Sequence, residues 1–553
     1  MKYLKIGIYE LYATGIIAFA AGLRVLLLAP GWPPTNSDEG TMAIMALNIA
    51  YRGEHPTIFY GQDYMGTLEA HLGAIFFRLA GGPSLFALRL SVVLLVTLFL
   101  VSTYALARLL FEKRLALVTL ALLSVGSIPL LTRQTIATGG SSQTLLFGSL
   151  AFLLATWLSL TYSRKPVRAL LPWRIAGYCC WGLVVGLGLW SDMVVVPFFV
   201  AAALLLLLCC WRELLWTWLA ILPCLFVGML PLISYDQGQG LNPFGILLGL
   251  AHGSNATAPS TLTGIIHNIL ATVLVSIPTA TGNPFCPVQE QPWLGDSSPH
   301  TLHCTLVHAI WGGGYLLLLS LALLHALRAC WRARTDAAIA HNTAGREQIV
   351  RSTARLLLAG GALLTIVLYT LSSGPVDQPG FHARYLVGLL IATPALIAPL
   401  WSAASAHISP ISALTRARTY VWRTILVLLW GILLGGTLIA FSEVPAAQAA
   451  QQRRSDLAAH LLKIKANHIY TEYWTCNSLA FASHERIICA VLDSNLQPTH
   501  NRAPRYFAIV QADRSAAYVF PMGSSQLAAF ERKMTQASYR RYTFDGYIVY
   551  QPR

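Results

Sequence analysis

Runs of about 20 apolar residues recur along this 553-residue chain, and they constrain its fold more than any other feature. A helix needs about 20 such residues to cross a bilayer, and its backbone groups must bond within the helix because lipid offers no partners. Only 11% of the residues are charged, against about a quarter in soluble proteins. With 55% hydrophobic residues, the chain is also unlike a disordered one. The sequence therefore predicts a polytopic α-helical membrane protein.

The apolar runs predict about eleven membrane spans, and the loops between them differ in charge. The predicted spans are 9–29, 84–110, 115–131, 143–162, 175–191, 193–211, 214–234, 305–327, 354–372, 384–401 and 423–441. Loops on one side carry 19 Lys or Arg residues, whereas loops on the other side carry six. Cytoplasmic loops are the basic ones, so we expect the N-terminus in the cytoplasm. The net charge of +15 therefore reflects topology in the cell membrane and does not indicate a nucleic-acid partner.

Two long segments are expected on the extracytoplasmic side. Residues 30–83 follow the first span, and their apolar stretches predict interfacial helices. Residues 235–304 lie within a stretch that has no Lys or Arg between Arg212 and Arg328. A cytoplasmic loop of that length would carry basic residues, so this segment is also predicted to be outside.

Residues 442–553 differ in composition from the transmembrane module predicted for residues 1–441. They contain 21 charged residues in 112, against 40 in the preceding 441. An odd number of spans places them outside, where we predict a small soluble α+β domain. The expected helices are 450–466 and 524–536, and the expected strands are His468–Tyr473, Arg486–Leu492, Tyr506–Gln511, Ala517–Phe520 and Tyr539–Tyr550.

Four of the ten cysteines fall in the predicted extracytoplasmic segments. Cys286 and Cys304 share the loop 235–304, and Cys476 and Cys489 share the C-terminal domain. Disulfides persist in oxidising compartments, so both pairs are disulfide candidates. The other six cysteines fall in spans or on the cytoplasmic side, where we expect small apolar packing residues.

The segment 30–83 contains the acidic pair Asp38-Glu39. Ser37 is a plausible N-cap, which would place both acids in the first turn of a helix that runs to Ala50. The helix dipole stabilises carboxylates there, so capping alone is one interpretation. The alternative is a general base for an acceptor hydroxyl, or a ligand of a divalent metal, at the outer membrane face.

The stretch from Tyr60 to His71 contains a second acidic position, Glu69, with His71 two residues later. Residues two apart do not share a helical face, so this pair does not form a metal site of the HExxH kind. The two open interpretations are a polar rim on an interfacial helix and a substrate-binding position.

Scarce charges on the predicted outer side single out two further positions. Asp192 interrupts an apolar hairpin, where it either caps the following span or belongs to a functional site, as acids at membrane depth often do. Arg384 and Tyr385 begin a later span. They either anchor it at the interface or bind a substrate phosphate through the guanidinium fork.

The order of these features resembles the GT-C glycosyltransferases. A first span is followed by a long outer loop that opens with Asp38-Glu39, and then by the stretch Gly-Gln-Asp-Tyr-Met-Gly-Thr-Leu-Glu-Ala-His from Gly61 to His71. This stretch is similar to the Gly-x-x-Tyr segment of the protein O-mannosyltransferase and aminoarabinose-transferase type. It is also similar to bacterial transferases whose module is named after rhizobial lipopolysaccharide galacturonosyltransferases. The motifs cover about residues 10–230.

The resemblance implies an integral-membrane glycosyltransferase acting at the outer membrane face. Such enzymes move a sugar from a polyprenyl-phosphate donor to an acceptor hydroxyl, with inversion, and the first acid of the pair, here Asp38, is the base. The expected partners are that donor, membrane lipid, and a glycan, lipid or protein acceptor. The predicted substrate-binding residues are Glu39, Glu69, His71, Asp192, Arg384 and Tyr385.

The sequence departs from several relatives in one loop. Arg133 precedes the segment Gly139–Thr144, where those relatives place a second acid, and Gln143 or Thr144 stands there instead. No cofactor is assigned with certainty, and a divalent metal is left open.

A lipid or sugar transporter without transferase activity is the alternative function. Transporters typically show repeated halves and ionisable residues in the middle of spans. No clear repeat is found, and the outer acids lie in loops and at helix ends. In the C-terminal domain, the aromatic segment Tyr470–Asn477 is predicted either to pack in the core or to contact the acceptor.

Overall fold

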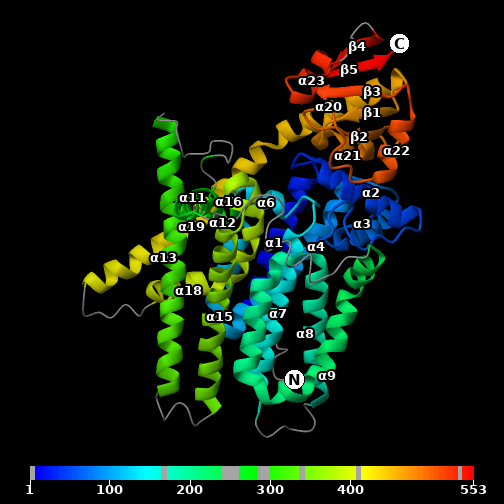
Figure 1. The fold of residues 1–553 in the computed structure, drawn as a ribbon. Helices are drawn as coiled ribbons and strands as arrows, with labels where there is room; N and C mark the ends of the chain where they lie inside the picture. The colour runs from blue at the N-terminus through cyan, green and yellow to red at the C-terminus, as the bar shows by residue number, and fades with distance from the viewer. Residues whose placement is uncertain are drawn as a thin grey trace. The chain divides into compact units, whose positions relative to one another are not determined.

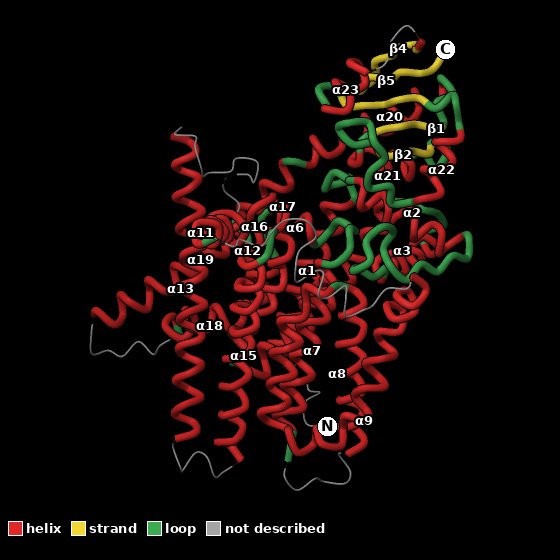
Figure 2. The backbone as a smooth tube through the Cα atoms, in the orientation of Figure 1, coloured by secondary structure: helices red, strands yellow, loops and turns green. Residues whose placement is uncertain are grey.

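The computed structural model describes residues 7–163, 171–239, 261–283, 286, 299–335, 343–405, 413–533 and 538–553. These residues are mainly helical, and the strands among them occur in the C-terminal part (Figure 2). The chain divides into two compact units. The first, here the helical unit, comprises Met1–Leu23, Leu94–Gln134 and Gly140–Ala440. The second, here the sheet unit, comprises Arg24–Val93, Thr135–Gly139 and Phe441–Arg553.

The helical unit contains the long apolar helices labelled in Figure 1. Helices shared with the sheet unit are α1 (Ile8–Leu28), α4 (Leu85–Leu110) and α19 (Ala413–Ser442). Its other helices are α5 (Lys113–Ser124), α6 (Ile128–Arg133), α7 (Ser141–Thr161), α8 (Leu171–Ser191), α9 (Val196–Gln239), α11 (Leu262–Ala271), α12 (Ile277–Thr281), α13 (Pro299–Thr335), α15 (Thr343–Leu371), α16 (Gly374–Asp377), α17 (Pro379–His382) and α18 (Thr393–Ala404). Within the described ranges, nine helical segments are long and apolar enough to cross a membrane. The polytopic helical prediction is confirmed.

Three details of the predicted span pattern differ from the structure. The predicted span 115–131 is divided between α5 and the short α6. The predicted break between the spans 193–211 and 214–234 lies at Cys210, where non-helical backbone angles separate the two helices that together form α9, and α9 begins at Val196, after a short 3-10 turn at Met193–Val195. The predicted loop 235–304 contains Leu262–Thr281, a helical segment that is itself apolar enough to span, whereas 240–260, 284–285 and 287–298 lie outside the described residues.

Glycines bring α8 and α9 into close contact and so define the hairpin that contains Asp192. A Cβ added at Gly182 would lie 2.5 Å from the carbonyl oxygen of Ile221, and one at Gly186 would lie 2.2 Å from that of Leu225. These glycines are four residues apart and share one face of α8. Small residues at such positions let membrane helices pack backbone to backbone, so larger side chains there would separate the hairpin.

The sheet unit combines the first outer loop with the C-terminal domain. Its complete helices are α2 (Ser37–Tyr51), α3 (Leu68–Leu79), α20 (Val444–Lys463), α21 (Tyr473–Ala482), α22 (Pro504–Ala512) and α23 (Ser525–Lys533). Its strands are β1 (His468–Thr471), β2 (Ile488–Val491), β3 (Ala517–Pro521), β4 (Tyr539–Phe544) and β5 (Tyr547–Pro552), in the order β2-β1-β3-β5-β4. β1 is parallel to β2 and β3, and β5 is antiparallel to β3 and β4. The predicted α+β class is therefore correct.

One predicted strand is wrong, and one helix was missed. Residues Tyr506–Gln511 belong to α22, in which Tyr506 and Val510, four residues apart, form the buried face. Short apolar runs do not distinguish a strand from a buried helix, which explains the error. The missed helix, α21, follows β1 directly and begins where Glu472 accepts a hydrogen bond from the backbone N–H of Trp474.

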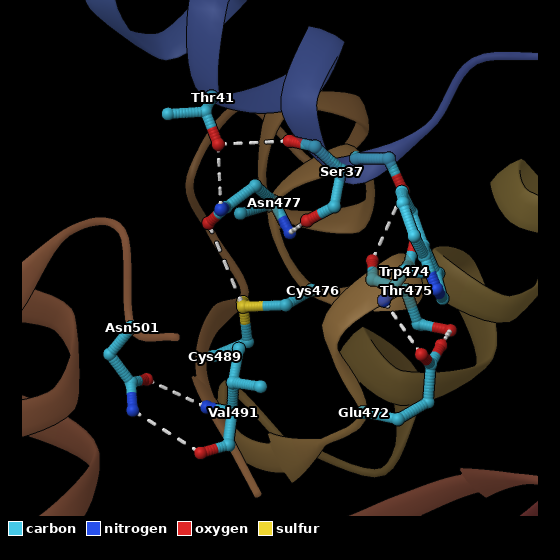
Figure 3. Close-up of a disulfide and its surroundings, with 12 residues drawn as sticks. Ser37, Thr41, Glu472, Trp474, Thr475, Cys476, Asn477, Cys489, Val491 and Asn501 are labelled. Atoms are coloured by element: carbon cyan, nitrogen blue, oxygen red, sulfur yellow. Dashed lines mark hydrogen bonds between the residues drawn. A yellow bond between two sulfur atoms is a disulfide. The ribbon is translucent and has the colours of Figure 1, made fainter. Parts of the chain in front are cut away.

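Both cysteine pairs singled out by the sequence form disulfides, Cys286 to Cys304 and Cys476 to Cys489. The second joins α21 to the parallel strand β2, next to Asn477 (Figure 3). This disulfide therefore fixes α21, the helix that contacts the start of α2 in the same unit.

Candidate functional site

The first turn of α2 presents Asp38 and Glu39 at a well-defined helix start. Asn36 is the N-cap, because its side chain accepts a hydrogen bond from the backbone N–H of Glu39 (2.9 Å). The prediction of Ser37 as N-cap was wrong by one residue, since Asn caps helices as well as Ser does. Ser37 instead accepts a hydrogen bond from the backbone N–H of Asn477 in α21 (3.2 Å; Figure 3).

Gly40 explains how α2 packs on α21. A Cβ at position 40 would lie 2.4 Å from the backbone carbon of Asn477 and from the backbone nitrogen of Ser478. Asn477 also donates its side-chain N–H to Thr41 (2.8 Å; Figure 3). The acidic turn is thus held directly against the backbone of the C-terminal domain.

Glu39 is fully buried in an ion pair with Arg89 at the start of α4. Arg89 binds both carboxylate oxygens, at 2.7 Å through Nε and 2.6 Å through Nη2, and both side chains are almost inaccessible to solvent. The backbone N–H of Ala137 also donates to Glu39 (3.1 Å). A buried carboxylate needs this degree of compensation, so Glu39 has a structural role in addition to its position beside Asp38.

Asp38 has partners from the C-terminal domain. The hydroxyl of Tyr473 donates a hydrogen bond to Oδ1 of Asp38, and Arg502 Nη2 lies 3.6 Å from the same oxygen. Arg502 also donates from Nε to the Tyr473 oxygen (2.9 Å), and from Nη1 to the carbonyl of Gly61 (2.7 Å). One guanidinium therefore links the carboxylate, the phenol and the Gly-x-x-Tyr segment.

Electrostatics keep the Tyr473 phenol as a hydrogen-bond donor. Burial and the adjacent Asp38 carboxylate raise the pKa of Tyr473 well above its usual range. The Arg502 guanidinium lies 5.4 Å from the centre of the Tyr473 ring and 5.6 Å from that of Phe59. Asp38 thus faces a guanidinium that lies against the rings of Tyr473 and Phe59.

Glu69 and His71 make different hydrogen bonds. Buried Glu69 accepts a hydrogen bond from the backbone N–H of Gly139 (2.9 Å), which ends the short segment Thr135–Gly139 of the sheet unit. His71 turns back on its own helix, where Nδ1 lies 3.0 Å from the carbonyl of Thr67. The binding roles of both residues stay predictions, and buried Glu69 is the one that holds the backbone at Gly139.

The acidic pair does not fit a two-carboxylate metal site. Glu39 is engaged by Arg89, and Asp38 faces a guanidinium rather than further carboxylates or imidazoles. Among the described residues, no group of three or more His, Cys, Asp or Glu side chains is arranged to hold a metal ion.

In the helical unit, Asp192 caps the short turn between α8 and α9. Its carboxylate accepts a hydrogen bond from the backbone N–H of Val194 (3.0 Å). Burial raises the pKa of Asp192 to about 6, opposed by the nearby charge of Arg384. A Cβ at Gly140 would lie 2.3 Å from its carboxylate oxygen, so only glycine lets this loop approach the acid.

Arg384 belongs to a cluster of aromatic and basic side chains in the same unit. Its Nη2 donates to the Tyr385 hydroxyl (3.1 Å), and its guanidinium lies 4.4 Å from the centre of the Phe381 ring. Arg133 contacts the neighbouring segment through Gly380 (3.4 Å), and its Nη1 is buried without a hydrogen-bond partner. Arg133 and Arg384 are close enough for their like charges to interact, and two guanidinium groups so placed favour the binding of an anion.

The fold is similar to that of two solved membrane proteins. ArnT from Cupriavidus metallidurans, bound to undecaprenyl phosphate, matches with a TM-score of 0.56 and 13% identity over 97% of each chain. The Archaeoglobus fulgidus oligosaccharyltransferase in its apo form matches with a TM-score of 0.53 and 12% identity, over 100% of this chain and 75% of that one. No family model and no curated protein sequence matches the chain.

These similarities define the class of fold. ArnT and the archaeal oligosaccharyltransferase are both GT-C membrane glycosyltransferases, and the likeness covers nearly the whole of this chain. The chain is a multi-pass membrane protein whose fold is similar to those of ArnT and the archaeal oligosaccharyltransferase.

Proposed function

We propose that this protein is an integral-membrane glycosyltransferase that moves a sugar from a polyprenyl-phosphate carrier to an acceptor hydroxyl at the outer membrane face. The observation that carries the proposal is the environment of Asp38 in the sheet unit. Its carboxylate stands at a helix N-terminus, and its neighbour Glu39 is neutralised by Arg89. Its own partners are a phenol and a guanidinium from the C-terminal domain. The GT-C fold supports the reaction class.

Asp38 is the proposed general base. The acceptor hydroxyl binds the Asp38 carboxylate beside the Tyr473 hydroxyl, which stays hydrogen-bonded to Oδ1, and passes its proton to the other carboxylate oxygen, Oδ2. The acceptor oxygen then forms a bond to the anomeric carbon from the face opposite the carrier. The bond from that carbon to the phosphate oxygen breaks, and its electron pair leaves with the phosphate, so the configuration is inverted.

The leaving group requires cationic stabilisation more than it requires an acid. A phosphate attached to a polyprenol leaves as an anion, so a second carboxyl group of the hydrolase type is unnecessary. We assign Arg384 to this phosphate and Asp192 to hydroxyl groups of the donor sugar. Arg133, with an unsatisfied buried Nη1 in the same helical unit, is proposed as a second phosphate contact.

The proposed topology places the N-terminus in the cytoplasm and the C-terminal domain outside. This assignment rests on the distribution of Lys and Arg among the loops. The disulfide between Cys476 and Cys489 supports it, because such bonds persist in oxidising compartments.

The direct experiment supplies purified protein in nanodiscs with a panel of polyprenyl-phosphate sugars and candidate acceptors. Donor-dependent transfer is expected with the wild type and is expected to be lost in Asp38→Asn. Transfer that survives this substitution unaltered would remove Asp38 as the base. Sugar-lipid movement across the bilayer without transfer from any donor would instead favour a transporter.

A further inference from the structure

The sheet unit contains a polar cleft that the proposed reaction does not use. Its volume is about 630 Å³, and it lies between the end of α1, the start of α4, α20 and α21. Asp38, Tyr473 and Arg502 are not among its lining residues. The cleft is therefore separate from the proposed base, although both are in the same unit.

One face of α20 supplies a row of polar groups to the cleft. Gln448, Gln451, Gln452 and Ser455 all line it, and their spacing of three, four and seven residues places them on one side of the helix. Gln448, Gln451, Gln452 and Ser455 are exposed to solvent. Amide and hydroxyl groups both donate and accept hydrogen bonds, so this row suits a ligand that carries several hydroxyl or ester oxygens.

The described lining residues of the cleft include two arginines, Arg89 and Arg454, and no Asp or Glu. Arg89 is neutralised by Glu39 on its other side. Arg454 donates from Nη2 to the carbonyl of Thr35 (3.1 Å) and leaves its positive charge on the cleft wall. An anionic group is therefore the expected occupant near Arg454.

The ends of apolar helices surround this cleft. α1 ends at Leu28 and α4 begins at Leu85, and both residues line the cleft. α20 begins at Val444, two residues after α19 ends at Ser442. All three long helices, α1, α4 and α19, belong to candidate membrane spans. Phe86 also lines the cleft and is 40% exposed, so an apolar surface adjoins the polar wall.

We propose that this cleft binds the headgroup of an anionic phospholipid in the leaflet next to the C-terminal domain. The phosphodiester is held by Arg454, and the hydroxyl groups of the headgroup bond to the amides of Gln451 and Gln452. The acyl chains remain in the bilayer beside Phe86. Arg89 forms part of the cleft wall, so the bound lipid also contacts Arg89, which neutralises Glu39.

The test measures binding of fluorescent phosphatidylglycerol to the full-length protein in phosphatidylcholine nanodiscs. Arg454→Gln is expected to weaken binding about ten- to hundredfold, because it removes a hydrogen bond between two charged groups. Arg453→Gln is the matched control, since Arg453 is the adjacent exposed residue on α20 and does not line the cleft. Gln451→Ala with Gln452→Ala provides a second variant on an exposed surface, and it is expected to weaken binding as well.

Three outcomes would overturn the proposal. Equal weakening by Arg453→Gln would show that binding depends on general surface charge. Unchanged binding in Arg454→Gln and in the double glutamine variant would place the lipid elsewhere. Equally tight binding of soluble glycerophosphoglycerol to protein in pure phosphatidylcholine nanodiscs would identify a site for a free phosphodiester and not for a bilayer lipid.

Discussion

Two carboxylates in different units of this protein are held in contrasting ways. The Asp192 carboxylate accepts a hydrogen bond from a backbone N–H only two residues later, and its environment is set mainly by the packing of one helical hairpin. Asp38 is bound by Tyr473 and Arg502, which are more than 400 residues further along the chain. A cap needs only local geometry, whereas the distant partners of Asp38 require a folded C-terminal domain. This difference favours Asp38 over Asp192 as the centre of the proposed site.

The largest expected effect separates the two acids directly. Asp38→Asn should lower kcat about 10²- to 10⁴-fold, because a general base contributes an effect of that order. Asp192→Asn should mainly raise KM, since we assign Asp192 to binding the donor sugar. Steady-state transfer kinetics at matched protein folding, checked by thermal unfolding, distinguish the two. An equal loss of kcat in both variants would contradict this contrast.

The second prediction concerns the buried pair behind Asp38. Glu39→Gln leaves Arg89 buried without a counter-charge, so it should destabilise the protein by about 3–5 kcal/mol. The matched control is Glu54→Gln, because Glu54 pairs with Arg505 at a more exposed position (2.9 Å). That change should cost at most about 1 kcal/mol. Thermal unfolding in nanodiscs measures both, and similar midpoints for the two variants would refute the structural role of Glu39.

A smaller effect is expected at the contact between α2 and α21. Gly40→Ala adds a Cβ only 2.4 Å from the backbone of Asn477, which should cost about 1–3 kcal/mol through overpacking. Gly22→Ala in α1 is the control, since no atom lies within 4 Å of its added Cβ. Proteolysis of the C-terminal domain reports the contact. Unchanged protection in Gly40→Ala would show that the two helices are not packed this closely.

The smallest expected effect tests the Tyr473 hydrogen bond. Tyr473→Phe keeps the ring and removes the donor to Asp38, so kcat should fall about tenfold with little change in stability. Tyr470→Phe is the control, because its hydroxyl makes only a long contact with the carbonyl of Val510 (3.5 Å). Equal kcat values for both variants and the wild type would mean that the phenol does not position the carboxylate.

The sequence predicted the features of the site that depend on order along the chain. Apolar run length identified the membrane helices, and the position of Asp38-Glu39 after the first span identified the acidic turn. The partners of the two acids could not be found in this way. Arg89 and Arg502 have no local pattern that distinguishes them from other basic residues, and their roles follow from tertiary contacts.

The errors in the sheet unit have a similar cause. Residues Tyr506–Gln511 have strand-forming side chains, but the chain starts a helix at Pro504, and proline is compatible with a first helical turn. The helix α21 was missed because its residues are mostly buried, which removes the periodic pattern of a half-exposed helix. In both places, the segment is a helix, and its residue pattern alone does not reveal this.

The link between Asp38 and Tyr473 also has a consequence for biosynthesis. The two residues are 435 positions apart, so at about 5–20 residues per second the ribosome needs roughly 20–90 s to reach the second after the first. During that interval the acidic turn has been made but lacks its phenol and guanidinium partners. A nascent chain therefore cannot assemble this arrangement early, and truncation anywhere before residue 473 yields a protein without it.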